Sequence, residues 1–453
     1  MDLGRTADLV GIEWQGSAAA HVQLRFCDER GAWSPWAQAG CCGHGPDQQE
    51  SVEARSVGEP VWTGGTRVVE VRSSPEVVGV QAHMVDVSGG LGARTRAALA
   101  GSAGSLPAAQ PVLESGPGQP TIIARRAWAL GISHPKVAPE YGSVKLAFVH
   151  HTENPNGYSA GEVPAMLRAI YAFHRYVNGW NDIGYNFVID RFGRIFEARA
   201  GGIDEPVVGA HAGGYNLAST GVAVLGSYMS TPISAAARSS LEHLLAWKLS
   251  LHGIPSRGRV TVKVNPAGAV YSRFPANARV SLPRIAGHRD GDSTDCPGDV
   301  LYGELPAVRQ AVAHLAPTPL QVSLVFTPPS STTPGSGEAS ANLPSGALSG
   351  ALTLTDGTPL AGAPVQLQLR NVARRGEAVS ERSVAEVVTD AQGHFELAGS
   401  FPGLSGKVSL RALCPGFGTF GATVSDPLAV DLPAVSPPAA PAPTPPAAVP
   451  PAT

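Results

Sequence analysis

The sequence predicts a mixed-sheet α/β core with flanking helices, placed between two small all-β units of the sandwich type. Three observations support this fold class. Apolar and polar residues alternate with a period of two near both ends of the chain, as in half-buried strands. Apolar residues recur at helical spacing in the middle, and stretches rich in Pro, Gly and Ser separate the three parts.

The chain length allows several domains. Its 453 residues, 43% of them hydrophobic, suffice for two to four folded cores at ~100–200 residues each. We predict a β-sandwich-like unit at 1–95, a linker at 96–120, an α/β unit at 121–316, a Pro/Ser/Thr-rich linker at 317–345, a second β-sandwich-like unit at 346–432 and a disordered Pro/Ala-rich tail at 433–453.

The alternation in the outer units is local and regular. Val22, Leu24 and Phe26 alternate with polar residues in the first unit, as Val365, Leu367 and Leu369 do in the last. The turn-forming run at 389–393, TDAQG, precedes another apolar alternation and predicts a β-hairpin there.

The middle unit predicts both helices and strands. Ser159 and Glu162 have capping-box spacing, which predicts a helix beginning near Ser159. A second helix is predicted over 232–252, with Pro232 in its first turn. Strands are predicted at 146–150, 186–190, 194–198 and 221–225.

Charge and hydropathy exclude some classes of partner. The net charge is −3 and the pI is about 6.5, so we expect no nucleic-acid partner, which would need a clustered basic face. We expect no membrane span, because no run of about 18 apolar residues occurs. The N-terminus lacks a basic segment followed by an apolar one, so no signal peptide is readable.

Cysteine usage is not that of a disulfide scaffold. The cysteines are odd in number and irregularly spaced: Cys27, Cys41, Cys42, Cys296 and Cys414. Adjacent cysteines such as Cys41 and Cys42 pair with each other only under strain. At least one cysteine therefore needs another explanation.

Two segments of the middle unit carry residues that bind metals. His150 ends an apolar strand, and Cys296 follows His288 by eight positions across a loop of Gly, Asp and Ser. A catalytic zinc site needs three such ligands and one open position. The alternatives are a satisfied polar residue at the strand end for His150 and an inert buried thiol for Cys296.

A third segment, GWNDIGYNF at 179–187, places Tyr185 at a loop-to-strand junction. A tyrosine there can present its hydroxyl to a cleft. It can equally be an ordinary packing residue.

Taken together, these segments resemble the peptidoglycan recognition protein and type 2 N-acetylmuramoyl-L-alanine amidase family. The resemblance covers 121–316 and runs through RAW at 126–128, VHHT at 149–152, GWNDIGYNF, GAHA at 209–212 and GHRD at 287–290 followed by DCPG at 295–298. The flanking units look similar to β-domains attached to such amidases in secreted actinobacterial proteins.

The resemblance implies specific roles. It implies Zn²⁺ as cofactor, bound by His150, His288 and Cys296, and catalytic roles for Tyr185 and for Thr294, where phage relatives carry Lys. It also implies contacts to a muramyl peptide from His151, Thr152, His174, Trp180, His211 and Asn216. Gly179-Trp180 matches the pair associated with meso-diaminopimelate peptides.

The implied function is hydrolysis of the lactyl-amide bond between N-acetylmuramic acid and L-alanine in bacterial peptidoglycan. The alternatives are a non-catalytic peptidoglycan-binding recognition protein and a zinc hydrolase of another amide; the H-E-x-x-H pattern of common zinc peptidases is missing. We expect an extracellular or cell-wall-associated protein. The sequence leaves the oligomeric state and the ligands of the β-units open.

Overall fold

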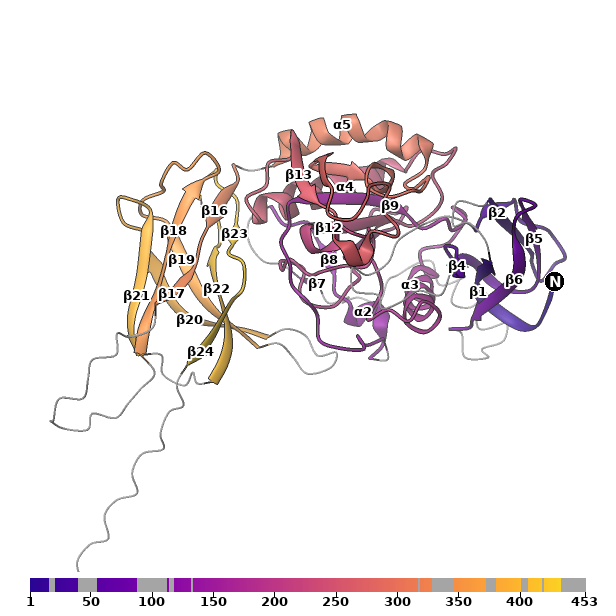
Figure 1. Ribbon diagram of the computed structural model, residues 1–453, viewed down its shortest axis with the longest axis horizontal. Coiled ribbons are helices and arrows are strands. Elements are labelled where there is room, and N and C mark those ends of the chain that lie inside the picture. The colour runs from indigo at the N-terminus through magenta and orange to yellow at the C-terminus, as the bar shows by residue number, and fades with distance from the viewer. Residues whose placement is uncertain are drawn as a thin grey trace, which may run out of the picture.

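The computed structural model describes residues 1–15, 21–39, 55–87, 112–113, 118–131, 133–316, 318–327, 345–371, 380–400, 406–417 and 419–432. In these residues a mixed α/β unit lies between two all-β units (Figure 1). The predicted fold class is therefore confirmed. Cys41, Cys42, the predicted tail and most of both predicted linkers lie outside the described residues.

The N-terminal unit is an antiparallel sheet in the order β3-β2-β5-β1-β4, with β6 also paired to β1. Its strands are β1 (Asp2–Gln15), β2 (Val22–Cys27), β3 (Ala37–Gln38), β4 (Arg55–Val57), β5 (Val61–Ser73) and β6 (Val78–Val85). Val10, Ile12 and Trp14 of β1 pack inside this unit, whereas Leu9 packs against the middle unit. Both faces of β1 are thus covered.

The middle unit is built on a mixed sheet in the order β15-β9-β12-β10-β11-β8-β7. Its strands are β7 (Val112–Leu113), β8 (Ile122–Ile123), β9 (Leu146–His151), β10 (Phe187–Ile189), β11 (Ile195–Glu197), β12 (Ser219–Val224) and β15 (Ile285–Gly287). β15, β9, β12 and β10 run parallel. Helices cover both faces, which explains why β9 and β12 are buried at every residue.

The helices are α2 (Arg126–Ala129), α3 (Val163–Ala172), which continues as a π-helical turn (Phe173–Val177), α4 (Ala235–Leu251) and α5 (Asp299–Leu315). One apolar cluster packs α4 and α5 against one face of the sheet, and another packs α2 and α3 against the opposite face (Figure 1). A hairpin of β13 (Arg259–Lys263) and β14 (Arg279–Pro283) packs beside Leu146 and Phe148. No helix in the described ranges is long and apolar enough to cross a membrane.

The predicted helix starts need correction. α3 begins at Val163, because the backbone N and the Oγ of Ser159 both donate to Glu162 Oε2 at 2.8 Å and hold a turn before the helix. α4 begins at Ala235, so Pro232 lies before the helix and not in its first turn, and Ser234 supplies the N-cap by accepting from Ala237 N. The sequence pattern missed α5, which contains Pro306 in its interior.

The C-terminal unit is a two-sheet sandwich. One sheet contains β16 (Leu320–Val322), β17 (Val325–Thr327), β18 (Ser345–Leu354) and β21 (His394–Ser400); the other contains β19 (Pro364–Asn371), β20 (Ser380–Val388), β22 (Gly406–Cys414), β23 (Thr423–Val424) and β24 (Leu428–Leu432). The predicted hairpin at 389–393 is wrong. This turn crosses between the sheets, since β20 pairs with β19 and β21 pairs with β18.

Buried charges join the C-terminal unit to the middle unit. Arg370 Nε lies 2.8 Å from Glu205 Oε1, and Arg411 contacts both Glu205 and Asp204. The side chains of Arg370, Arg411 and Glu205 are almost completely buried. Each charge in this interface therefore depends on its partner, because an unpaired buried charge is costly.

Replacing Glu205 tests this interface. Glu205→Gln removes the negative charge that two buried guanidinium groups share, so we expect a loss of about 3 kcal/mol in the free energy of unfolding. Urea denaturation measures it. The control is Glu242→Gln in the partly exposed Arg238–Glu242 pair, where the loss should stay below about 1 kcal/mol. Equal losses in the two variants would contradict this reading of the interface.

Candidate metal centre

Two neighbouring parallel strands bring the predicted metal ligands together. His150 lies at the end of β9, and His288 follows directly after β15, which pairs with β9. Cys296 lies in the loop that leads into α5. His150 Nδ1 is 3.7 Å from Cys296 Sγ, the two imidazole centroids are 4.4 Å apart, and one ligand atom from each residue falls within 4.8 Å of the others.

The far nitrogen of each imidazole is held by a further side chain. His150 Nε2 lies 3.1 Å from His211 Nδ1, and His288 Nε2 lies 2.9 Å from Asp292 Oδ2. These contacts leave Nδ1 of both rings for a metal. Partners of this kind fix the orientation of metal-binding histidines.

The surroundings of Cys296 favour a thiolate. The backbone N of His151 donates to Cys296 Sγ at 3.4 Å. Burial lowers the pKa of His150 to about 4, which keeps that ring neutral. Burial also opposes charge on His288, but Asp292 and Cys296 outweigh it and raise its pKa to about 10. Without a metal, a positive His288 thus faces the sulfur.

The donor set fits Zn²⁺. Two imidazoles and a thiolate are borderline-soft ligands that suit a tetrahedral zinc ion with one position left over. His150, His288 and Cys296 are 0%, 0% and 2% exposed. The site therefore lies in a low-dielectric environment, where electrostatic interactions are strong.

Tyr185 lies beside this cluster, just before β10. Its ring centroid is 5.4 Å from that of His150. Its hydroxyl donates to Glu59 Oε2 at 3.5 Å. Tyr185 is thus close enough to His150 to act on a group bound at the metal.

Thr294, the other predicted catalytic residue, has a visible structural contact. Its Oγ1 accepts a hydrogen bond from the backbone N of Cys296 at 3.1 Å. The side chain therefore shapes the loop that presents the sulfur, and its catalytic role stays a prediction.

The predicted substrate contacts at 151 and 152 lie at the end of β9 and are buried. His151 Nε2 is 2.7 Å from Glu153 Oε1; although burial opposes it, the charge of Glu153 raises the pKa of His151. Thr152 Oγ1 accepts from Asn154 Nδ2 at 2.8 Å and from Gly226 N at 3.0 Å.

The other predicted contacts flank the same cluster. His174 packs on Trp180 with centroids 4.5 Å apart and accepts from Gly184 N, and its burial lowers its pKa to about 3. His211 lies against His150, and Asn216 Oδ1 accepts from the backbone N of His211. The roles of these side chains in binding a muramyl peptide stay predictions.

Sequence reasoning missed three acidic residues near the cluster. Asp292, four positions after the predicted ligand His288, and Glu153, two after the predicted substrate contact His151, had a local signal in this spacing. Glu59 had none, because it belongs to the N-terminal unit and reaches the site only through the fold.

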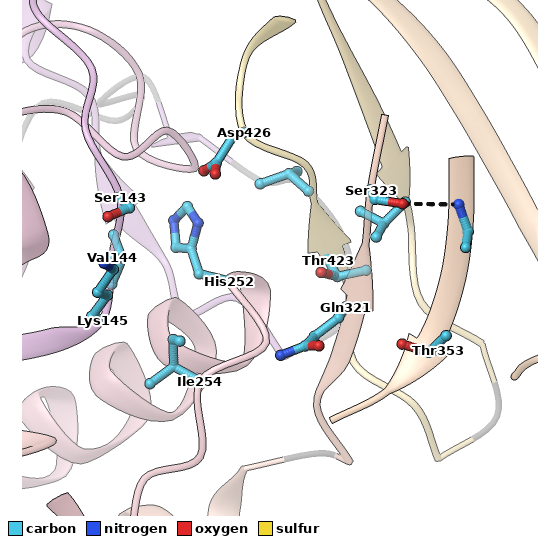
Figure 2. Close-up of a pocket in the computed structure, with 13 residues that line it drawn as sticks. Ser143, Val144, Lys145, His252, Ile254, Gln321, Ser323, Thr353, Thr423 and Asp426 are labelled. Carbon is cyan, nitrogen blue, oxygen red and sulfur yellow. Dashed lines mark hydrogen bonds between the residues drawn. The ribbon is translucent and has the colours of Figure 1, made fainter. Parts of the chain in front are cut away.

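A separate cavity lies between the middle and C-terminal units. It has a volume of about 490 Å³, and its lining includes Lys145, His252 and Asp426. Figure 2 shows His252 of the middle unit around this cavity together with Gln321, Thr423 and Asp426 of the C-terminal unit. The residues that line it include none of the predicted ligands.

Two parts of the chain match families of known proteins. Residues 140–299 match the family described as N-acetylmuramoyl-L-alanine amidase. Residues 6–104 match a family described as Rv3811 N-terminal galactose-binding domain-like.

Individual relatives match less than half of the chain. Peptidoglycan-recognition protein SC2 of Drosophila simulans is 29% identical over 185 residues, which are 41% of this chain and 84% of that protein. Human N-acetylmuramoyl-L-alanine amidase is 30% identical over 211 residues, 45% of this chain and 31% of that protein. The solved structure of Drosophila PGRP-LB is 26% identical, covering 41% of this chain and 92% of that one, with a TM-score of 0.32.

Replacing Asp292 tests the metal centre without any substrate. Asp292→Asn removes the carboxylate that holds His288, so zinc affinity should fall by ~10–100-fold. Competition with a chromophoric zinc chelator measures the affinity. The control is Asp299→Asn, which changes an exposed carboxylate paired with Arg289 and should leave the affinity unchanged. If both variants bind zinc like the parent protein, Asp292 does not support the metal ligands.

Proposed function

Because residues 140–299 form a domain of the N-acetylmuramoyl-L-alanine amidase family, we propose that this protein is a zinc-dependent amidase. It hydrolyses the lactyl-amide bond between N-acetylmuramic acid and L-alanine in peptidoglycan. The observation that carries the proposal is the convergence of His150, His288 and Cys296 within 4.8 Å, beside Tyr185. Three protein ligands leave the fourth position of a tetrahedral zinc ion for water or substrate, whereas a structural zinc site would use a fourth protein ligand.

Zinc held there would polarise the scissile carbonyl and lower the pKa of the attacking water towards neutrality. The chain's own residues do the rest. His211 and Asp292 fix the two imidazoles, and Tyr185 can donate its hydroxyl to the oxygen on which negative charge develops. A well-aimed donor of this kind contributes about 3 kcal/mol to transition-state stabilisation. Thr294 supports the reaction by holding the loop of Cys296.

The proposed substrate determines the proposed location. Peptidoglycan lies outside the cytoplasmic membrane, so the protein would act in the cell wall or outside the cell. Relatives named peptidoglycan-recognition proteins support peptidoglycan as the partner. The same names favour a second candidate, binding of peptidoglycan without hydrolysis, and the experiment below distinguishes the two.

Digestion of purified sacculi tests the amidase. The zinc-loaded protein should release stem peptides with free L-alanine amino groups. Cys296→Ser should abolish release, because a neutral hydroxyl is a poor zinc ligand. Tyr185→Phe should slow it by ~10²–10³-fold through loss of one hydrogen-bond donor. Mass spectrometry of the soluble products measures the release.

The control for Tyr185→Phe is Tyr176→Phe, which makes the same change at an exposed ring and should leave the rate unchanged. A zinc-loaded protein that binds sacculi but cleaves neither them nor a soluble muramyl tripeptide, with or without Cys296, would refute the amidase and favour recognition alone.

A further inference from the structure

A segment of the N-terminal unit covers the metal centre. It consists of residues 58–63, GEPVWT, which follow β4 and include the first three residues of β5, and all six residues are buried. Val57 and Trp62 pack in the same apolar cluster as Tyr185 and Ile170 of the middle unit. The metal ligands are therefore closed off from solvent partly by a unit that is separate in sequence.

Specific hydrogen bonds anchor this segment. The backbone N of Trp62 donates to Asn154 Oδ1 at 2.6 Å, and Asn154 Nδ2 in turn donates to Thr152 Oγ1 at 2.8 Å. The Trp62 indole donates to Glu162 Oε1 at 3.4 Å. The segment thus engages, through Asn154, one of the residues predicted to contact the substrate.

The neighbouring strand β1 also packs closely against the middle unit. A Cβ on Gly11 would lie 2.1 Å from the ring of Phe173 in the π-helical turn after α3. Only a residue without a side chain allows this approach. The N-terminal unit is therefore fitted to the middle unit and does not merely touch it.

Glu59 is the residue of the segment that reaches the cluster. Its carboxylate accepts from Tyr185 Oη at 3.5 Å. Burial raises the pKa of Glu59 well above its usual value, the negative charges of Cys296 and Glu153 raise it further, and His288 and Tyr185 oppose them. A buried carboxylate beside a thiolate is costly unless a cation compensates the two charges, and a zinc ion held by His150, His288 and Cys296 would do so.

We propose that residues 58–63 form an autoinhibitory plug, in which the Glu59 carboxylate occupies the place at Tyr185 and the metal that the scissile amide must take. The proposal rests on the proposed amidase function. Its geometric basis is that Glu59 engages the tyrosine donor while Trp62 engages the Asn154–Thr152 pair. A polymeric substrate then reaches the metal only when the N-terminal unit moves aside.

A catalytic role for Glu59 fits the structure less well. The residue is part of the cover, so any movement that admits a glycan strand also carries its carboxylate away from the metal. The two roles predict opposite effects of the same substitution. Removing a plug raises the rate on a substrate, whereas removing a catalytic acid or base lowers it.

The first experiment measures how far residues 58–63 shield Cys296, and it needs no hydrolysis. The metal-free full-length protein is treated with iodoacetamide, and modification of Cys296 is followed by mass spectrometry of its peptide. Glu59→Ala and Trp62→Ala should speed modification by about tenfold or more, because a buried thiol reacts through the open form. The control Glu76→Ala, an exposed carboxylate of the same unit, should match the parent protein. Circular dichroism checks that each variant is folded.

The second experiment measures hydrolysis of a soluble muramyl tripeptide by the zinc-loaded proteins. Glu59→Ala should cleave it several-fold faster than the parent protein and Glu76→Ala. A slower Glu59→Ala, or a parent protein whose Cys296 already reacts as fast as in the variants, would overturn the plug. If Cys296 becomes reactive in the variants but none of the proteins cleaves the peptide, the plug stands and the amidase function fails.

Discussion

The parallel pairing of β9 with β15 is the constraint on which the site depends. It places Gly287 opposite Val149, so that His150 and His288 leave the same edge of the sheet one residue later. The carboxyl ends of neighbouring parallel strands are a common place for ligand sites in α/β sheets. The short loop before α5 then brings Cys296 to the two histidines. His211 and Asp292 contact the far nitrogens of these two rings and fix their orientation.

Close packing around the imidazole of His211 limits which residues can occupy the neighbouring positions. A Cβ at Gly221 of β12 would lie 2.4 Å from the ring of His211, and a Cβ at Gly209 would lie equally close. Both glycines thus leave room for the imidazole that orients His150. The motif residues around the ligands are therefore explained by packing as much as by chemistry.

The sequence predicted much of the site, but less of the N-terminal segment that covers it. The strand carrying His150 was visible because its residues are apolar and continuous, and the His288–Cys296 loop because of its composition. The helix starts were missed by a few residues, since Ser159 holds a turn before α3 and Ser234 caps α4, and the packed structure decides both roles. Glu59 could not be predicted, because no local pattern encodes which face of one unit packs on another. Asp292 could have been predicted from its position four residues after His288.

X-ray absorption spectroscopy of the purified, zinc-loaded protein tests whether His150, His288 and Cys296 bind one zinc ion. We expect one sulfur neighbour at about 2.3 Å and two imidazole nitrogens at about 2.0–2.1 Å, with the sulfur neighbour lost in Cys296→Ser. A zinc ion surrounded by oxygen and nitrogen alone, or a sulfur neighbour that persists in Cys296→Ser, would rule out this metal centre.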